Sequence, residues 1–229
     1  MEKGIIPTCV GFIMDGNRRW AKAHDHSPHE GHKEGYRALQ KIITAVHAAG
    51  IPHLVCYAFS TENWKRTEDE VGYLMNLLGH ALREFRDEIK KKNAKINVRI
   101  IGEVERLPKN LQTEIRESEA MQVTDPELTV WIALSYGGRA EILSAVNKAV
   151  AQGELMTEET FEKYLWTEGM PDPDLIIRTS GEVRLSNFLL WQSAYSELFF
   201  TDTTWPDFGE FEFQSILEQY GKRQRRVGK

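Results

Sequence analysis

The sequence predicts an α/β protein, in which a single doubly wound domain has a mainly parallel central sheet flanked by helices. Short apolar runs of strand length alternate along the chain with segments whose apolar residues recur at helical spacing. The length of 229 residues suits one such domain. Because no repeat, low-complexity segment or long linker interrupts the pattern, we treat residues 1–229 as one domain.

Strands are predicted where a short apolar run lies between polar segments, as in "TCVGFIM" near the start of the chain. The final run, "ELFFT", is a short candidate. The ranges are 8–14, 53–59, 95–102, 128–136, 173–179 and 197–201. Because helical segments separate these runs, we expect βαβ units and parallel pairing.

Helices are predicted where apolar side chains recur along one helical face. The ranges are 35–49, 71–92, 108–121, 137–150 and 213–220. The space between the sheet and the amphipathic helices would hold either a packed core or a hydrophobic tunnel for a long hydrocarbon. Periodicity does not separate these two arrangements.

The bulk composition bounds the class of protein. The net charge is −5 and the pI is about 5.9, so nothing supports a nucleic-acid-binding module. Cys9 and Cys56 lie in strand-like runs and are expected to be buried thiols in a reducing compartment. We find no signal-peptide layout and no apolar run of membrane-spanning length. We therefore expect a cytoplasmic protein, with peripheral contact at the inner membrane face left open.

Polar residues gather where the predicted strands end. Asp15, Ser60, Tyr136 and Arg178 each come just past an apolar run, and in parallel sheets ligands bind at the carboxyl ends of the strands. In "VGFIMDGNRRWA" the aspartate is followed by a helix start and two arginines, a combination that suits an anion. A carboxylate beside a phosphate makes sense if a divalent cation such as Mg²⁺ bridges them. The alternative is a helix cap with solvated arginines.

Two further segments carry candidate site residues. The segment "IIRTSGEVRLSNF" supplies two guanidinium groups and three hydroxyl groups, which suit a diphosphate, although it could instead be a polar surface turn. The chain has no GxxxxGK[ST] phosphate loop. Glu197 is a candidate second acid near the metal. "YAFSTENWKR" follows the second strand and is polar from Ser60 onward.

Together these motifs resemble those of the cis-prenyltransferase family. The matching segments span nearly the whole chain and occur in the family's order: "IMDGNRRWAK", "GHKEG", "YAFSTENWKR", "YGGRAEI", "DPDLIIRTSGE", "RLSNFLLWQSAYSELFFTDTTWPDF" and "RQRRVGK". The resemblance implies a homodimer that condenses an allylic diphosphate, commonly farnesyl diphosphate, with several isopentenyl diphosphates. The expected product is a long-chain polyprenyl diphosphate, undecaprenyl diphosphate, which carries cell-wall sugars.

The motifs and the resemblance assign roles to individual residues. The expected catalytic residues are Asp15, Asn17 and Asn63, and the expected Mg²⁺ ligands are Asp15 and Glu197. The expected substrate-binding residues are Gly16, Arg18, Arg19, Trp20, His32, Ser60, Glu62, Trp64, Arg66, Arg178, Arg184 and Ser186. The segment 226–228 resembles the family's C-terminal element that reaches the partner subunit's site.

The chain departs from the family pattern at a few positions. Pro28 stands where an arginine is usual, which predicts weaker binding of the allylic substrate unless His29 or Lys33 replaces the contact. Trp131 and Ser135 stand where asparagine is common, and Trp131 would shorten the product if it faced the tunnel. Val183 replaces a histidine of some members, with little expected effect.

The sequence allows two alternative functions to be weighed against particular residues. A haloacid dehalogenase-type phosphatase needs a second acid two residues after the first, and Asn17 holds that position. The second rival is a non-catalytic scaffold subunit of an active partner. The charged residues expected in the active site are retained, which argues against a scaffold, but Pro28 in place of the usual arginine leaves this alternative open.

Overall fold

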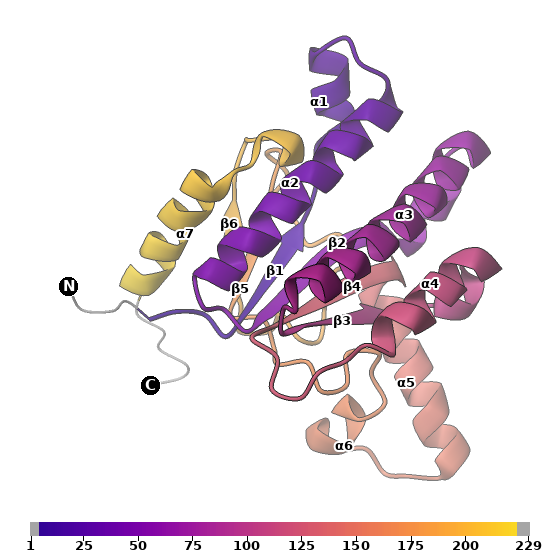
Figure 1. Cartoon of the computed structure of the whole chain (residues 1–229). Helices are drawn as coiled ribbons and strands as arrows, with labels where there is room; N and C mark the ends of the chain where they lie inside the picture. The colour runs from indigo at the N-terminus through magenta and orange to yellow at the C-terminus, as the bar shows by residue number, and fades with distance from the viewer. Residues whose placement is uncertain (1–4, 224–229) are drawn as a thin grey trace.

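The computed structural model describes residues 5–223, which form an α/β domain around one six-stranded sheet (Figure 1). The order of the strands is β3-β4-β2-β1-β5-β6, and every pairing is parallel. The strands are β1 (Cys9–Ile13), β2 (His53–Ser60), β3 (Ile96–Ile101), β4 (Leu128–Tyr136), β5 (Leu175–Arg178) and β6 (Glu197–Phe200). All six predicted strands are confirmed, and the sheet is wholly parallel rather than mainly so.

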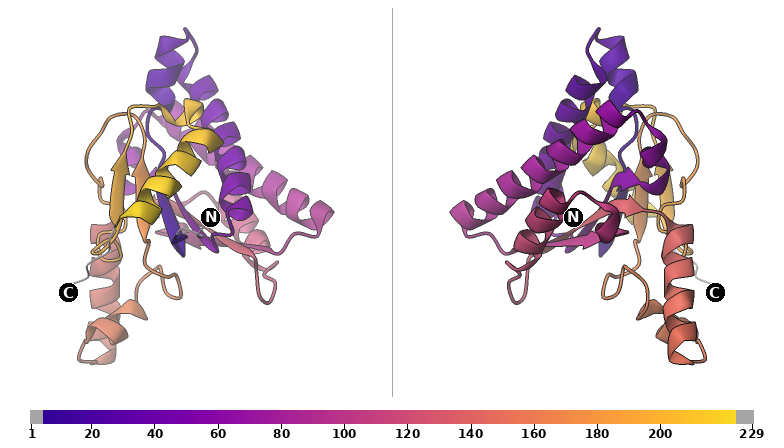
Figure 2. Two further views of the ribbon diagram at one scale, coloured as in Figure 1. Left: turned by 90° about the vertical axis from the view of Figure 1, so that its left-hand side faces the viewer. Right: turned by 90° about the vertical axis from the view of Figure 1, so that its right-hand side faces the viewer.

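Helices cover the two faces of the sheet unequally. The α-helices are α1 (Asn17–Ala23), α2 (Pro28–Ala48), α3 (Glu68–Lys92), α4 (Lys109–Glu119), α5 (Gly138–Gln152), α6 (Glu158–Glu162) and α7 (Glu210–Lys222). Short 3₁₀ turns are η1 (Thr61–Lys65), η2 (Val104–Arg106) and η3 (Trp205–Asp207). Helices α2, α3, α4 and α7 pack on one face of the sheet, whereas α5 and α6 extend away from the sheet (Figure 2). No helix in the described range is long and apolar enough to cross a membrane.

Helix α2 begins seven residues before the predicted start. The Ser27 side chain accepts the backbone N–H of Glu30, and the Glu30 carboxylate accepts the backbone N–H of Ser27, which forms a capping box. Pro28 occupies the first turn, where its missing N–H and fixed φ favour a helix start. The apolar pattern misses this turn because its exposed residues are polar.

The strand order places a topological switch beside β1. The chain runs from β1 to β2 on one side, and β5 later joins β1 on the other side. The loops after β1 and β5 therefore leave in opposite directions and open a crevice at the carboxyl ends of the strands. Asp15 follows β1 and Arg178 ends β5, so both lie at this crevice.

An apolar cavity of about 120 Å³ lies between the sheet and helices α2 and α3. Its walls include Leu39 of α2, Leu78 of α3, and Val130 and Ile132 of β4. The hydrophobic tunnel for a long hydrocarbon stays a prediction.

Trp131 does not face this cavity. Alternate residues of a strand point to opposite faces, and Trp131 is buried on the face away from Val130 and Ile132. Its indole N–H donates to His53 Nδ1 at 3.3 Å, and Arg99 lies over the ring. The condition under which Trp131 was expected to shorten the product, that it faces the space between the sheet and the helices, is therefore not met.

We predict that Phe213→Ala lowers the free energy of unfolding by about 3–5 kcal/mol, because Phe213 is fully buried against Phe12. Phe211→Ala is the matched control, since this side chain on the same helix is 87% exposed. Its effect should stay within about 0.5 kcal/mol in urea titrations. Equal losses in the two variants would contradict this account of the core.

Candidate active site

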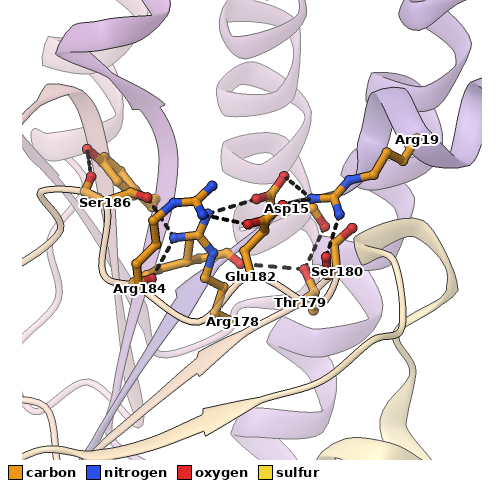
Figure 3. A network of polar contacts seen from close by, with 10 residues as sticks. Asp15, Arg19, Arg178, Thr179, Ser180, Glu182, Arg184 and Ser186 are labelled. Carbon is orange, nitrogen blue, oxygen red and sulfur yellow. Dashed lines mark hydrogen bonds and ion pairs between the residues drawn. The ribbon is translucent and has the colours of Figure 1, made fainter.

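Asp15 and Arg178 meet at the carboxyl edge of the sheet. Arg178 Nη2 donates to Asp15 Oδ2 at 2.9 Å, and the other carboxylate oxygen lies 3.4 Å from Arg19 Nη2 (Figure 3). The Arg178 side chain is only 4% exposed, whereas that of Asp15 is 33% exposed. A buried cation is therefore held by a carboxylate that still faces solvent.

The segment after β5 wraps around Arg178. Its Nη1 donates to Ser186 Oγ at 2.7 Å and to the Arg184 carbonyl at 2.5 Å, while its buried Nε has no hydrogen-bond partner within residues 5–223. Four non-glycine residues here have positive φ: Ser180, Ser186, Asn187 and Leu189. Such backbone strain collects at ligand sites, where the surrounding structure holds it.

Glu182 connects the two groups of cations in this segment. Its carboxylate lies 3.5 Å from Arg19 Nη2 and 2.5 Å from Arg184 Nη1. Arg19 also donates to the Ser180 carbonyl at 2.5 Å. Each arginine at this edge is thus paired with an acid or a carbonyl that an anionic ligand could replace.

The loop after β2 forms the opposite wall of one polar cavity of about 520 Å³. Asn187, which sequence reasoning missed, connects the walls by donating to Glu62 Oε1 at 3.0 Å. Asn63 Oδ1 accepts the backbone N–H of Ser60 at 3.1 Å. The predicted residues that line this cavity together are Asp15, Ser60, Glu62, Asn63, Arg66, Arg178 and Ser186.

A second missed residue, Glu70, joins three predicted cations. Its Oε1 lies 2.8 Å from Arg66 Nη1 and 3.2 Å from His32 Nε2, and its Oε2 lies 3.9 Å from Arg18 Nη1. Burial raises the pKa of Glu70, but the His32 hydrogen bond and the Arg66 charge outweigh it, so the pKa lies below its ordinary value. Burial lowers the pKa of His32 and so favours the neutral imidazole, although the hydrogen bond with Glu70 raises this pKa.

The turn into α1 brings Asn17 to the mouth of the apolar cavity. Gly16 makes this turn at φ 112°, a conformation that side chains disfavour. Asn17 and His32 line the apolar cavity, and Met14 and Tyr57 line both cavities. The polar and the apolar cavities therefore adjoin at Met14 and Tyr57.

Seven of the predicted residues line neither cavity: Gly16, Arg18, Arg19, Trp20, Trp64, Arg184 and Glu197. Trp20 donates its indole N–H to Asp207 Oδ1 at 2.8 Å, and Trp64 donates to Ser135 Oγ at 2.9 Å. Their rings hold α1 and η1 in place.

Glu197 stands at the opposite end of the sheet from Asp15. It pairs with Leu175 at the start of β5, so three residues of strand, about 10 Å, separate it from the level of Arg178. Its carboxylate pairs with Arg223 instead. The prediction that Glu197 serves as a second acid beside Asp15 is therefore wrong within one copy of the chain, because Glu197 is the first residue of its strand and the start of a parallel strand lies opposite the carboxyl edge.

Two of the four departures from the family pattern lie on the surface, whereas Trp131 and Ser135 are buried. Pro28 and Val183 are exposed. Of the proposed replacements for an arginine at position 28, His29 stacks on Tyr73 and lies 3.3 Å from Asp69. The predicted partner-reaching segment, 226–228, lies outside the described residues.

Asp15 is suited to hold a divalent cation together with a ligand's phosphate oxygens. Within residues 5–223, no three His, Cys, Asp or Glu side chains gather closely enough to hold a metal by themselves. A Mg²⁺ site built from one carboxylate and substrate phosphates needs no such cluster. The partly exposed Asp15 carboxylate beside Arg19 and Arg178 fits that kind of site.

Comparisons with known proteins agree with a prenyl-diphosphate site. A family profile described as "Putative undecaprenyl diphosphate synthase" matches residues 13–228. An isoprenyl transferase from Fusobacterium nucleatum is 47% identical, over 100% of this chain and 98% of the relative. A tritrans,polycis-undecaprenyl-diphosphate synthase (geranylgeranyl-diphosphate specific) from Pyrococcus horikoshii is 43% identical, over 100% and 89%.

The same likeness holds in three dimensions. The crystal structure of lavandulyl diphosphate synthase from Lavandula x intermedia, in complex with dimethylallyl diphosphate, superposes with a TM-score of 0.93. It is 36% identical and covers 98% of this chain and 99% of that one. The fold and site thus define a prenyltransferase of α/β architecture. The chain belongs to the undecaprenyl diphosphate synthase family, whose members are transferases that act on prenyl diphosphates and use a divalent metal.

We predict that Glu70→Gln lowers the pKa of His32 further below its ordinary value. The substitution removes the negative charge that stabilises the imidazolium, while burial still opposes it. An NMR titration of the His32 imidazole measures the change. Asp69→Asn is the control, because Asp69 pairs with His29 and should leave the His32 pKa unchanged. A raised or unchanged His32 pKa in Glu70→Gln would contradict the assigned contact.

Proposed function

We propose that this enzyme condenses farnesyl diphosphate with successive isopentenyl diphosphates to give a long-chain polyprenyl diphosphate with new cis double bonds. The observation that carries the proposal is the junction of two cavities. Asp15 and Arg178 mark the polar cavity, and Met14 and Tyr57 stand between it and the apolar cavity. A substrate with a diphosphate head and a hydrocarbon tail matches both parts.

Two diphosphates fit two groups of cations around Asp15. Asp15 and Arg19 would hold the allylic diphosphate with Mg²⁺, and Arg178, Arg184 and Ser186 would hold isopentenyl diphosphate. Separate cationic groups on the same crevice can align the reacting carbons of two anions that otherwise repel each other. When bound, Mg²⁺ supplies positive charge to the diphosphate oxygens.

The side chains of the site suit the charge that develops in the reaction. Loss of the allylic diphosphate builds negative charge on the leaving group, and Arg19 and Arg178 are already oriented toward that region. The neutral His32 and the amide of Asn17 lie where the diphosphate region meets the hydrocarbon cavity. Each condensation removes one proton from carbon. Asn17 and Asn63 are the candidates for helping with that removal.

The side chains between the apolar cavity and a neighbouring pocket would limit the length of the product. A neighbouring pocket of about 190 Å³ reaches toward Glu88 and Lys92, and Gln40, Ile43 and Phe85 line both spaces. Phe85 packs against the apolar clusters on either side. We assign Phe85 as the main part of this partition.

An exposed apolar stripe on α5 supports a homodimer. Leu143, Val146 and Val150 are exposed and lie on one face of the helix. Contact between two copies would bury this stripe, as the family resemblance implies. A cytoplasmic enzyme in peripheral contact with the inner membrane could then deliver its product as the lipid carrier for cell-wall synthesis.

The direct test incubates purified full-length protein with farnesyl diphosphate, labelled isopentenyl diphosphate and Mg²⁺, followed by chromatography of the products. We expect several rounds of extension by the wild type and a loss of at least about 10²-fold in kcat for Asp15→Asn. Geranylgeranyl diphosphate is the competing starter. No extension of either starter would overturn the proposal and favour a scaffold subunit that needs an active partner.

We predict that Phe85→Ala gives longer products, because removal of the ring joins the apolar cavity to the neighbouring pocket. Chromatographic product length measures the effect. Trp131→Phe, on the opposite face of the sheet, should leave product length unchanged. If Phe85→Ala made products of wild-type length, Phe85 would not form the partition.

A further inference from the structure

Helices α1 and α2 approach each other most closely at two glycines. A Cβ atom added at Gly31 would lie 2.2 Å from the backbone oxygen of Asn17 and 2.9 Å from Ala21 Cβ. A Cβ atom added at Gly35 would lie 2.3 Å from Asn17 Oδ1. Gly31 and Gly35 are four residues apart, so both lie on the same face of α2. Their lack of a side chain is what allows α1 to pack here.

Other helical glycines show that this closeness is not general. A Cβ atom at Gly72 of α3 would meet no described atom within 4 Å, and one at Gly79 would only touch Leu111 at 3.9 Å. Glycine destabilises a helix interior relative to alanine. The two glycines of α2 therefore have a packing reason that those of α3 lack.

The side chain that packs against Gly35 is that of Asn17, and its amide oxygen lacks a hydrogen-bond donor within residues 5–223. This oxygen is buried, yet Asn17 lines the apolar cavity beside His32. Buried polar atoms are nearly always paired, so an unpaired one marks a side chain that its surroundings hold in place. The oxygen is packed against Gly35, and this contact sets the direction of the Asn17 amide at the cavity mouth.

Gly35 itself is fixed from its other side. The buried Trp205 donates its indole N–H to the Gly35 carbonyl at 2.8 Å. Because this bond holds the α2 backbone in place, an added methyl group at Gly35 cannot be relieved by a small shift of α2. It would displace the Asn17 side chain instead.

We infer that Gly31 and Gly35 are positioning residues for the proposed reaction: Gly31 seats the backbone of Asn17, and Gly35 sets the direction of its amide. This inference rests on the proposed function only for what the Asn17 amide does. The seat itself is a property of the packing between α1 and α2. Gly35 acts through Asn17 and touches no substrate.

A double-mutant cycle between Gly35→Ala and Asn17→Ala tests the inference in the full-length protein. Gly35→Ala should lower kcat by about tenfold to a hundredfold, because a small misplacement of a reacting group has effects of that size. The KM for isopentenyl diphosphate should change less than about twofold, since Arg178 and Ser186 do not move. In the Asn17→Ala background, Gly35→Ala should have no further effect on kcat.

Gly72→Ala is the matched control and should leave kcat and the thermal midpoint at or above wild-type values, because its methyl group enters open space. Thermal unfolding gives a readout that does not need activity. Gly35→Ala should lower the midpoint, and Asn17→Ala should restore it in the double variant by removing the atom that the methyl group meets. This recovery also decides the case in which Gly35→Ala alone does not fold.

The inference is overturned if Gly35→Ala keeps wild-type kcat, if it lowers kcat equally in both backgrounds, or if the double variant shows no recovery of the thermal midpoint. Failure of the proposed function gives a different result. In that case the wild type extends neither starter, while the recovery of the thermal midpoint still reports on the seat.

Discussion

The contact between Asp15 and Arg178 is the interaction on which the site depends. It joins the ends of β1 and β5, the two neighbouring strands at which the direction of winding changes. A buried guanidinium is stable only if its donors are satisfied, and Asp15, Ser186 and the Arg184 carbonyl satisfy most of them. The strained segment after β5 is held in place by the same bonds. The anion site and the fold are therefore stabilised by one set of contacts.

The rest of the site changes from polar to apolar with distance from that contact. Arginines and hydroxyl groups surround Asp15. Met14 and Tyr57 form the boundary between this polar region and the apolar cavity. Glu70 gathers His32, Arg66 and Arg18 beside this boundary. In the proposed function, this arrangement would keep the charge of a prenyl diphosphate at the sheet edge and leave its hydrocarbon in the apolar cavity between the sheet and helices α2 and α3.

The sequence predicted the strands and the edge that carries the site because both follow from local rules. Apolar runs define the strands, and a parallel sheet gathers the residues that follow them. Glu70 and Asn187 were missed because their role comes from contacts between segments far apart in the chain, Glu70 with His32 and Asn187 with Glu62.

The errors have equally specific causes. Glu197 was placed beside the metal without knowledge of the β5–β6 register, which puts it at the other end of the sheet. Trp131 was given a role in the cavity although a buried strand is apolar on both faces, so its sequence does not reveal which residues face α2 and α3. The early start of α2 depends on a capping box rather than on apolar spacing.

Calorimetric titration with inorganic pyrophosphate, with and without Mg²⁺, tests the role of Asp15 most directly. In the wild type, Mg²⁺ should tighten the binding of pyrophosphate. In Asp15→Asn, Mg²⁺ should give no such gain, whereas metal-free binding should be at least as tight as in the wild type because a repelling charge is gone. The same gain from Mg²⁺ in both proteins would contradict the account.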